Sequence, residues 1–169
     1  MALILPVQGV KPQFGDNCFL ADNATVVGRV VMGDNCSVWF NAVVRGDVNT
    51  IEIGDNTNIQ DGAIIHCTYQ TAATVIGSHV SIGHNAIVHG CTVHDKVLIG
   101  MGAIVMDHAV VESGSIIAAG AVVLEHTRVE ANSIYAGVPA RKVKQVDGKR
   151  DEVFMRTARN YIMYAEWFK

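Results

Sequence analysis

Aliphatic side chains recur along this chain with a period of six residues. From Val93 onward every sixth position is a β-branched aliphatic, which gives the series Val93, Ile99, Val105, Val111, Ile117, Val123 and Val129. The same period appears upstream in shorter runs, and a small residue such as Ala86 or Ala103 follows each aliphatic by four positions. Gly, Asp and Asn occupy many of the positions between, as tight turns require. The pattern is therefore a hexapeptide repeat.

A hexapeptide repeat predicts a prism-shaped parallel β-helix. Neither an α-helix nor a flat hairpin sheet needs one large and one small inward residue every six positions. In a prism each short strand contributes one aliphatic side chain to the interior, and each corner needs a small residue. Three hexads make one coil of about 18 residues, and coils stack at about 4.8 Å, the spacing of parallel strands. We predict an all-β solenoid over about residues 10–140, within a β-helix domain of residues 1–140.

The repeat stops after Pro139, and residues 141–169 are charged and amphipathic. We predict that they form a linker and an α-helix that packs along the outside of the prism. The apolar stripe expected on this helix consists of Val153, Phe154, Ala158, Tyr161, Ile162, Ala165 and Trp167.

The repeat is interrupted in three places, all within one block of the chain. Extra residues occur around "GDVNT" at 46–50 and in "CTYQTAAT" at 67–74, and the step from Val88 to Val93 is one residue short. In a regular solenoid such breaks map to surface loops, where function is often found. Most of the histidines lie in the same block.

Counting faces brings two of these histidines together. Ile65 and Val88 are three hexad steps apart, one full coil, so they are predicted to stack on one face of the prism. His66 and His89 each follow a stacked aliphatic residue, so both side chains should point outward from that face, one above the other. Arg45 occupies the same column one coil earlier.

His84 occupies a different position. It lies two residues after Ile82, on the preceding face and close to a corner, where the previous coil carries Asp61. His84 is therefore expected to lie away from the other two histidines within its own chain. An ion shared by all three would need His84 from a neighbouring subunit, and a cyclic trimer would form three identical sites of this kind.

Three imidazoles with an open fourth position are typical of catalytic zinc, whereas structural zinc sites fill all four positions, usually with cysteine. We therefore predict that His66, His84 and His89 bind a metal, and we interpret the other histidines as surface polar residues. Cys67 and Cys91 are not expected to be ligands. The four cysteines form no C-x-x-C pair, so neither a zinc knuckle nor a redox motif is indicated.

Composition narrows the choice of partners. The formal net charge is −3 and the pI about 6.1, which gives no electrostatic reason to expect nucleic acid or an anionic membrane. No apolar run approaches the roughly 20 residues that span a bilayer. The start "MALILPVQGVKP" has no basic region and too short an apolar run for a secretory signal, so we expect a cytoplasmic protein.

Motifs in the histidine-rich block resemble the gamma-class carbonic anhydrases. The resemblance rests on "RGD" at 45–47, "NIQDGAIIH" at 58–66, "GHNAIVHG" at 83–90 and "ARNYIMY" at 158–164, and it covers nearly the whole chain. It implies a left-handed β-helix and a homotrimer, with His84 contributed across the subunit interface. The residues that it assigns are the zinc ligands His66, His84 and His89, the subunit-linking pair Arg45 and Asp47, the polar residues Asn58, Gln60 and Asp61 near the metal, and Tyr161, with Tyr164 as the second choice.

The implied reaction is the reversible hydration of CO2 to bicarbonate. Zinc, with Fe2+ or Co2+ as alternatives, lowers the pKa of a water molecule in such sites to about 7. Gln60, Tyr161 and Asn58 are the predicted catalytic residues, which would orient the reacting groups through hydrogen bonds. Asp61 would hold a ligand imidazole or the Arg45 side of the site.

One departure from the resembled family concerns proton export. The founding member carries a glutamate directly after R-G-D and a second in an acidic loop, whereas here Val48 follows Asp47 and residues 67–74 contain no acid. Weak activity is therefore expected.

Two other functions remain open from the sequence. Many left-handed β-helix proteins transfer acyl groups from coenzyme A with one histidine base. The stretch "ANSIYAGVPARKV" at 131–143 resembles the end of the β-helix domain in those proteins. The third possibility is a non-catalytic protein that binds metal or takes part in assembly. Fold alone does not choose among the three.

Overall fold

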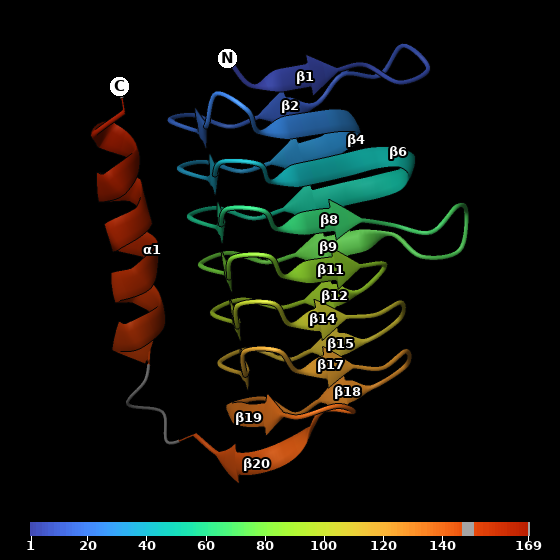
Figure 1. Cartoon of the computed structure of the whole chain (residues 1–169), viewed down its shortest axis with the longest axis vertical. Coiled ribbons are helices and arrows are strands. Elements are labelled where there is room, and N and C mark those ends of the chain that lie inside the picture. The colour runs from blue at the N-terminus through green and yellow to red at the C-terminus, as the bar shows by residue number, and fades with distance from the viewer. Residues whose placement is uncertain (147–150, 169) are drawn as a thin grey trace.

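A computed structural model describes residues 1–146 and 151–168. The chain forms a left-handed parallel β-helix with one α-helix beside it, as the hexapeptide repeat and the family resemblance predicted (Figure 1). Successive coils stack along the long axis from the N-terminal end, and the prism has three faces.

The first face, which we call the helix face, is an eight-stranded sheet. Its neighbours pair in parallel at steps of one coil, for example Ile59 with Ile82 and Ile82 with Ile99. The strands from the N-terminal end are β3 (Phe19–Leu20), β5 (Ser37–Val38), β7 (Asn58–Ile59), β10 (Ser81–Ile82), β13 (Leu98–Ile99), β16 (Ile116–Ile117) and β19 (Ser133–Ala136). The last strand, β20 (Arg141–Gln145), pairs antiparallel with β19 and has no counterpart in the hexapeptide pattern.

The other two faces form one 12-stranded sheet, because two long strands run around the corner between them. These strands are β4 (Thr25–Met32) and β6 (Val43–Ile53). The face that carries the first halves of β4 and β6, here called the histidine face, also contains β1 (Leu3–Leu5), β8 (Ile64–His66), β11 (Ile87–His89), β14 (Ile104–Val105) and β17 (Val122–Val123). The third face contains their second halves with β2 (Gln13–Phe14), β9 (Thr74–Ile76), β12 (Thr92–Val93), β15 (Val110–Val111) and β18 (Arg128–Val129).

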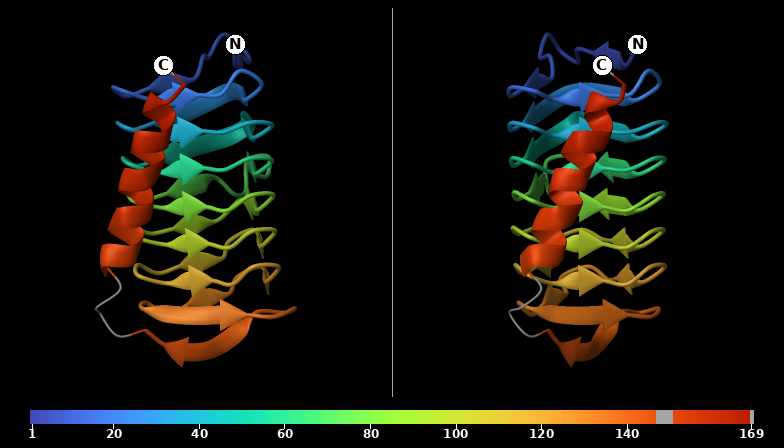
Figure 2. Two further views of the ribbon diagram at one scale, coloured as in Figure 1. Left: turned by 60° about the vertical axis from the view of Figure 1, so that its left-hand side comes forward. Right: turned by 90° about the vertical axis from the view of Figure 1, so that its left-hand side faces the viewer.

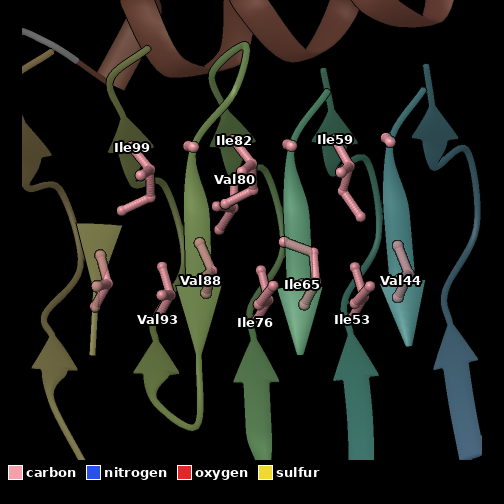
Figure 3. Packing of buried hydrophobic residues seen from close by; sticks show 14 of the residues in the cluster. Val44, Ile53, Ile59, Ile65, Ile76, Val80, Ile82, Val88, Val93 and Ile99 are labelled. Carbon is pink, nitrogen blue, oxygen red and sulfur yellow. The ribbon is translucent and has the colours of Figure 1, made fainter. Parts of the chain in front are cut away.

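Columns of aliphatic side chains fill the prism (Figure 3). Val44, Ile65 and Val88 stack in register on the histidine face, and all three are 0% exposed. Figure 3 shows matching columns on the other faces, and each buried aliphatic side chain stabilises the fold by about 1.5–3 kcal/mol. The period of six therefore exists because every strand must contribute to this interior.

The corners are built from small buried residues and from residues with left-handed backbone. Asn41 and Asn85 have φ values of 60° and 57°, which Asn tolerates better than most residues. Three histidines, His79, His108 and His126, have the same backbone conformation, with φ of 57–59°. These histidines are therefore corner residues.

The three breaks in the repeat have different outcomes. The break at 46–50 lies inside the 11-residue strand β6, which pairs with β4 on both sides of it, and the register between the two strands shifts where the extra residues lie. The break at 67–74 does form a projecting loop, closed by a bridge between Thr68 and Ala72, with Tyr69 63% exposed at its tip. The short step after Val88 is absorbed by Gly90, whose φ is +54°.

The helix α1 (Asp151–Glu166) lies along the helix face, as the sequence predicted (Figure 2). Phe154, Ala158 and Ala165 are its buried residues. Two residues of the predicted stripe are exposed instead: Val153 lies in the first turn and Trp167 lies just past the helix end, both outside the contact with the sheet. In the part of the chain that the structure describes, no helix is long and apolar enough to cross a membrane.

Candidate metal centre

Two histidines face each other on the histidine face. His66 and His89 end β8 and β11 and are paired in register, so the predicted stacking is correct. His66 Nδ1 lies 3.0 Å from His89 Nε2, and the ring centroids are 5.0 Å apart. The pair exists because both residues follow a buried aliphatic in the same column.

A carboxylate holds the outer nitrogen of each ring. His66 Nε2 lies 3.0 Å from Asp47 Oδ1, and His89 Nδ1 lies 2.5 Å from Asp107 Oδ1. When each outer nitrogen donates its hydrogen to a carboxylate, both inner nitrogens present lone pairs to the same space. Two lone pairs at 3.0 Å repel unless a proton or a cation lies between them. Imidazoles oriented by carboxylates in this way are typical metal ligands, so the donor set fits zinc.

Neighbouring groups shift the pKa values of His66 and Asp47. Burial lowers the pKa of His66, and the nearby Arg45 and His89 act in the same direction, although Asp47 opposes them. Burial alone would raise the pKa of Asp47, but hydrogen bonds from His66 and Arg45 outweigh it and lower that pKa. The result is a neutral imidazole beside an ionised carboxylate, which is the protonation state that metal binding requires.

Arg45 and Asp47 lie together beside the histidine pair. Arg45 Nη1 is 2.5 Å from Asp47 Oδ2, while the other oxygen of Asp47 accepts from His66. The Arg45 side chain is 43% exposed, so it is available to a neighbouring molecule as well.

Asp107 is a site residue that the sequence analysis missed. Its Oδ2 accepts a hydrogen bond of 2.5 Å from Thr68 Oγ1 in the projecting loop, while Oδ1 contacts His89. Burial opposes ionisation of Asp107, but the hydrogen bonds from Thr68 and His89 lower its pKa. The signal was present, because Val88 pairs with Val105, so the coil step from His89 leads to the residue just before Asp107.

His84 lies near the corner at the edge of the helix face. Its Nδ1 is 2.9 Å from Asp61 Oδ2, which agrees with the predicted stacking of these two residues. The His84 side chain is 38% exposed, and within residues 1–146 and 151–168 no second histidine ring contacts it. It is therefore oriented by one carboxylate and open to the outside.

A cavity of about 420 Å³ joins His84 to Gln60 and Tyr161 beneath α1. The rest of its lining is largely apolar and includes Leu98 and Ile116. Gln60 Nε2 donates to Asn58 Oδ1 at 3.0 Å, so the Gln60 side chain is held by its neighbour on β7. His84, Gln60 and Tyr161 thus form a second cluster, and Tyr164 is not among the residues that line this cavity.

Burial raises the pKa of Tyr161 to about 12, with the Asp61 carboxylate acting in the same direction. The Tyr161 hydroxyl therefore stays protonated at physiological pH. The Tyr161 ring contacts the Trp39 ring at a centroid distance of 5.4 Å, and this contact holds the Tyr161 side chain between α1 and the helix face.

The three predicted ligands are not brought together within one chain. His66 and His89 share one cluster, and His84 belongs to the other. Among the residues that the structure describes, no group of three or more His, Cys, Asp or Glu side chains is arranged to hold a metal ion.

The remaining histidines and the two nearby cysteines lie in other settings. His94 is paired only loosely with Glu112, at 3.8 Å, and the rings of His108 and His126 stack at 4.8 Å. Burial raises the pKa of the Cys67 thiol, and it raises that of Cys91 to about 12. Both cysteines are buried in the prism.

Comparison with known proteins places the chain in a family. A family model for the bacterial transferase hexapeptide, described as six repeats, matches residues 11–46 and 90–125. Carbonic anhydrase of Geobacillus kaustophilus is 41% identical over 99% of this chain and 91% of its own length. This chain belongs to the gamma carbonic anhydrase family of hexapeptide-repeat proteins.

Two further relatives widen the picture. Gamma carbonic anhydrase 1 of Arabidopsis thaliana, named as mitochondrial, is 39% identical over 92% of this chain, which spans only 58% of the plant protein's length. A crystal structure of a hexapeptide transferase family protein from Anaplasma phagocytophilum has a TM-score of 0.93 at 38% identity, covering 99% of this chain and 98% of that one. The predicted cytoplasmic location stays a prediction.

Proposed function

We propose that this protein is a gamma-type carbonic anhydrase that hydrates CO2 reversibly at a three-histidine zinc site between the subunits of a homotrimer. The single observation that supports this best is the division of the candidate residues into two clusters. One cluster contains His66 and His89, the other contains His84 with Gln60 and Tyr161, and each is open to a neighbouring molecule.

The division of the candidate residues into two clusters favours one site shared between subunits over two separate sites within a chain. Among the described residues of one chain, the facing imidazoles have no third histidine ligand of the kind a catalytic zinc site uses, and His84 has no partner ring. When the surface carrying His84 meets the surface carrying His66 and His89, both needs are met. When the rotation between copies closes, such contacts between unlike surfaces form a ring, and a ring of three copies would contain three identical sites.

Each residue of the proposed site has a defined role. Zinc, when bound, supplies a Lewis acid that lowers the pKa of water to about 7, and Fe2+ or Co2+ could take the same imidazoles. Asp47, Asp107 and Asp61 each hold one ligand ring in the tautomer that leaves its inner nitrogen free. This positioning is what the three carboxylates contribute.

The cavity beneath α1 supplies the rest of the site. Its apolar lining suits CO2, which is apolar and weakly hydrated, and excludes competing water. Asn58 fixes the amide of Gln60, so that its Oε1 is left to accept a hydrogen bond from a reacting group. The protonated hydroxyl of Tyr161 is available to donate one to bicarbonate.

Mixing two inactive variants tests the proposal. His84→Ala and His89→Ala each remove one ligand from every site of a homotrimer, so each alone should be inactive and metal-poor. In a trimer that contains both variants, one interface joins an intact His66–His89 pair to an intact His84. Random mixing at equal amounts should therefore restore roughly a quarter of the wild-type sites, measured as zinc content and CO2 hydration.

The outcomes are distinct. If the mixture binds no more zinc than either variant alone, although native mass spectrometry with one variant labelled with 15N shows mixed trimers, the site is not shared between subunits. If zinc returns in the mixture but wild-type protein does not hydrate CO2, the shared site stands and the carbonic anhydrase proposal fails. His108→Ala mixed with His84→Ala is the control for mixing without loss of a second ligand.

One observation favours acyl transfer as a second candidate. The Anaplasma phagocytophilum structure is described as a hexapeptide transferase family protein, and the cavity beneath α1 offers an apolar wall beside His84. An acyltransferase with one histidine base would move the acetyl group of acetyl-CoA to an added hydroxyl or amine acceptor, and would release free coenzyme A without metal. Thiol release in the presence of a chelator would favour it over the carbonic anhydrase. A non-catalytic metal-binding or assembly role would show zinc but neither activity.

A further inference from the structure

Two cysteines at a corner of the first coils lie one above the other. We propose that Cys18 and Cys36 form a redox-active dithiol, which closes into an intrachain disulfide when a low-molecular-weight disulfide such as oxidised glutathione is present. The pair lies outside both clusters of the candidate metal centre, and the proposal does not depend on carbonic anhydrase activity.

The residues on either side of the cysteines fix their separation. Asn17 Nδ2 donates to Asn35 Oδ1 at 3.0 Å, and Phe19 pairs with Ser37. Cys18 therefore stacks on Cys36, and the backbone bond from Phe19 N to Cys36 O, at 2.9 Å, ties the two coils there. Stacked parallel strands have a spacing of about 4.8 Å, which lies within the Cα separation that disulfides span.

The two thiols differ in hydrogen bonding and in exposure. The Cys18 thiol donates to Gly33 O at 3.2 Å, and the Cys36 thiol donates to Gly54 O at 3.1 Å. Cys18 is partly exposed and lines a cavity of about 340 Å³ with Leu20, Asp22 and Phe40, whereas Cys36 is 1% exposed. A small disulfide can therefore reach Cys18 but not Cys36.

The electrostatic environment assigns the same roles. The neighbouring Cys36 side chain lowers the pKa of Cys18 to about 7, so a substantial share of Cys18 is thiolate at neutral pH, while the Cys18 side chain and burial raise the pKa of Cys36. Burial raises the pKa of the other two cysteines, Cys67 and Cys91. A thiolate is the attacking form in disulfide exchange, so Cys18 is the attacking residue and Cys36 the resolving one.

The exchange is balanced in two steps. Cys18 thiolate attacks one sulfur of oxidised glutathione, forming a mixed disulfide and releasing one glutathione thiolate, which takes up a proton. The Cys36 thiol then loses its proton to solvent as its sulfur attacks Cys18 Sγ, forming the protein disulfide and expelling the second glutathione. Two protein thiols are oxidised, and one glutathione disulfide is reduced to two thiols.

The absence of a C-x-x-C motif had indicated no redox pair. In a β-helix, however, residues one coil apart are neighbours, and 18 and 36 differ by one coil. The repeat therefore replaces the short loop that brings two cysteines together in ordinary redox motifs.

Peptide mapping of the intact protein tests the pair directly. The full chain is incubated with excess oxidised glutathione at pH 7.5, blocked with N-ethylmaleimide in denaturant and digested with trypsin, which cuts after Arg29 between the two cysteines. The expected product joins the Cys18 peptide to the Cys36 peptide, with Cys67 and Cys91 blocked. Wild-type protein in which Cys18 and Cys36 are both blocked by N-ethylmaleimide would overturn the proposal.

Variants separate the two roles. Cys36→Ser, with Cys36→Ala as a second version should serine disturb the corner, should accumulate the mixed disulfide of Cys18 with glutathione at least tenfold above wild type. Cys18→Ser should leave Cys36 reduced, and Cys67→Ser should behave as wild type. Equal glutathione labelling of Cys36 in the Cys18→Ser protein would contradict the assigned order of attack.

Discussion

The histidine face and the edge of the helix face both hold imidazole side chains in place, but they do so in different ways. On the histidine face, two imidazoles from successive coils meet at 3.0 Å and are held from behind by Asp47 and Asp107. At the edge of the helix face, a single imidazole, His84, is held by Asp61 beside an apolar cavity. The first region contains two of the three histidines proposed to bind the metal. The second contains the third histidine beside an apolar cavity of the kind that binds small substrates.

The difference teaches how a regular repeat can build an irregular site. Stacking at one coil brings like positions together, so it readily yields a pair of histidines in one column. A third ligand from another direction cannot come from the same column. A repeat protein can obtain that ligand from a second copy, and the two regions described here are suited to such an exchange.

Removal of single ligands should have the largest effect. His66→Ala and His89→Ala should each abolish stoichiometric zinc binding and raise the Kd for zinc by more than about 100-fold, because the remaining imidazole of the pair cannot hold the ion as tightly as both do. His84→Ala should abolish activity as fully, yet retain weak zinc binding at the remaining pair. Metal analysis by mass spectrometry checks this, with His94→Ala and His126→Ala as controls, and a control as costly as a ligand would contradict the assignment.

Removal of a carboxylate behind a ligand should rank second. Asp107→Asn loses the charge that holds His89, and should raise the zinc Kd by about 10–100-fold while leaving the fold intact. Thr68→Val, which removes the hydrogen bond to Asp107, should act in the same direction by a smaller factor. Titration with Co2+, followed by its visible spectrum, measures this. The matched control is Glu112→Gln, which removes the carboxylate that lies 3.8 Å from His94. An unchanged affinity in Asp107→Asn would place His89 outside the metal site.

Changes in the cavity should lower turnover without loss of metal. Tyr161→Phe removes a hydroxyl that is protonated at neutral pH, and Gln60→Ala removes an amide held by Asn58. Each should lower kcat by about tenfold to a hundredfold at full zinc occupancy. Tyr164→Phe is the control, because Tyr164 does not line the cavity. Equal loss in that control would indicate a general effect of the helix rather than a role for Tyr161.

The smallest expected effect concerns proton export. Val48 lines a cavity with Asp47 and Tyr69, where no acidic side chain other than Asp47 is found among the lining residues. The hydration rate in weak buffer should therefore rise several-fold with imidazole at fixed pH and ionic strength, because a diffusible base replaces the missing acceptor. Val48→Glu should reduce this dependence, measured by stopped flow. A fast rate that ignores buffer would reveal another proton acceptor.

The fold was predictable from the sequence because burial imposes a strict period. Val44, Ile65 and Val88 had to stack, and this fixed the positions of Arg45, His66 and His89 as well. The same argument separated His84 from the pair. Positions set by the repeat could be predicted to the residue.

Features that interrupt the repeat could not be predicted in this way. Residues 46–50 were expected to form a loop, but they stay within the strand β6 as an irregularity, where the register with β4 shifts between Gly28–Gly46 and Val30–Ile51. Asp107 was missed because the short step at Gly90 shifts the register by one residue. β20 was missed because its pairing is antiparallel and its side chains are exposed. Each of these depends on local geometry that a period of six does not encode.

The helix beside the prism also sets the permissible lengths of such a molecule. α1 has 16 residues and is therefore about 24 Å long, which equals about five coils at 4.8 Å each. The solenoid can gain or lose material only in whole coils, whereas a helix changes length by single residues. Deletion of one coil, such as residues 116–133, would join Ser115 to Ile134 in register yet leave nearly one helical turn without a sheet beneath it. Natural or engineered variation in this architecture should therefore come in matched steps, with about three residues of helix for every coil.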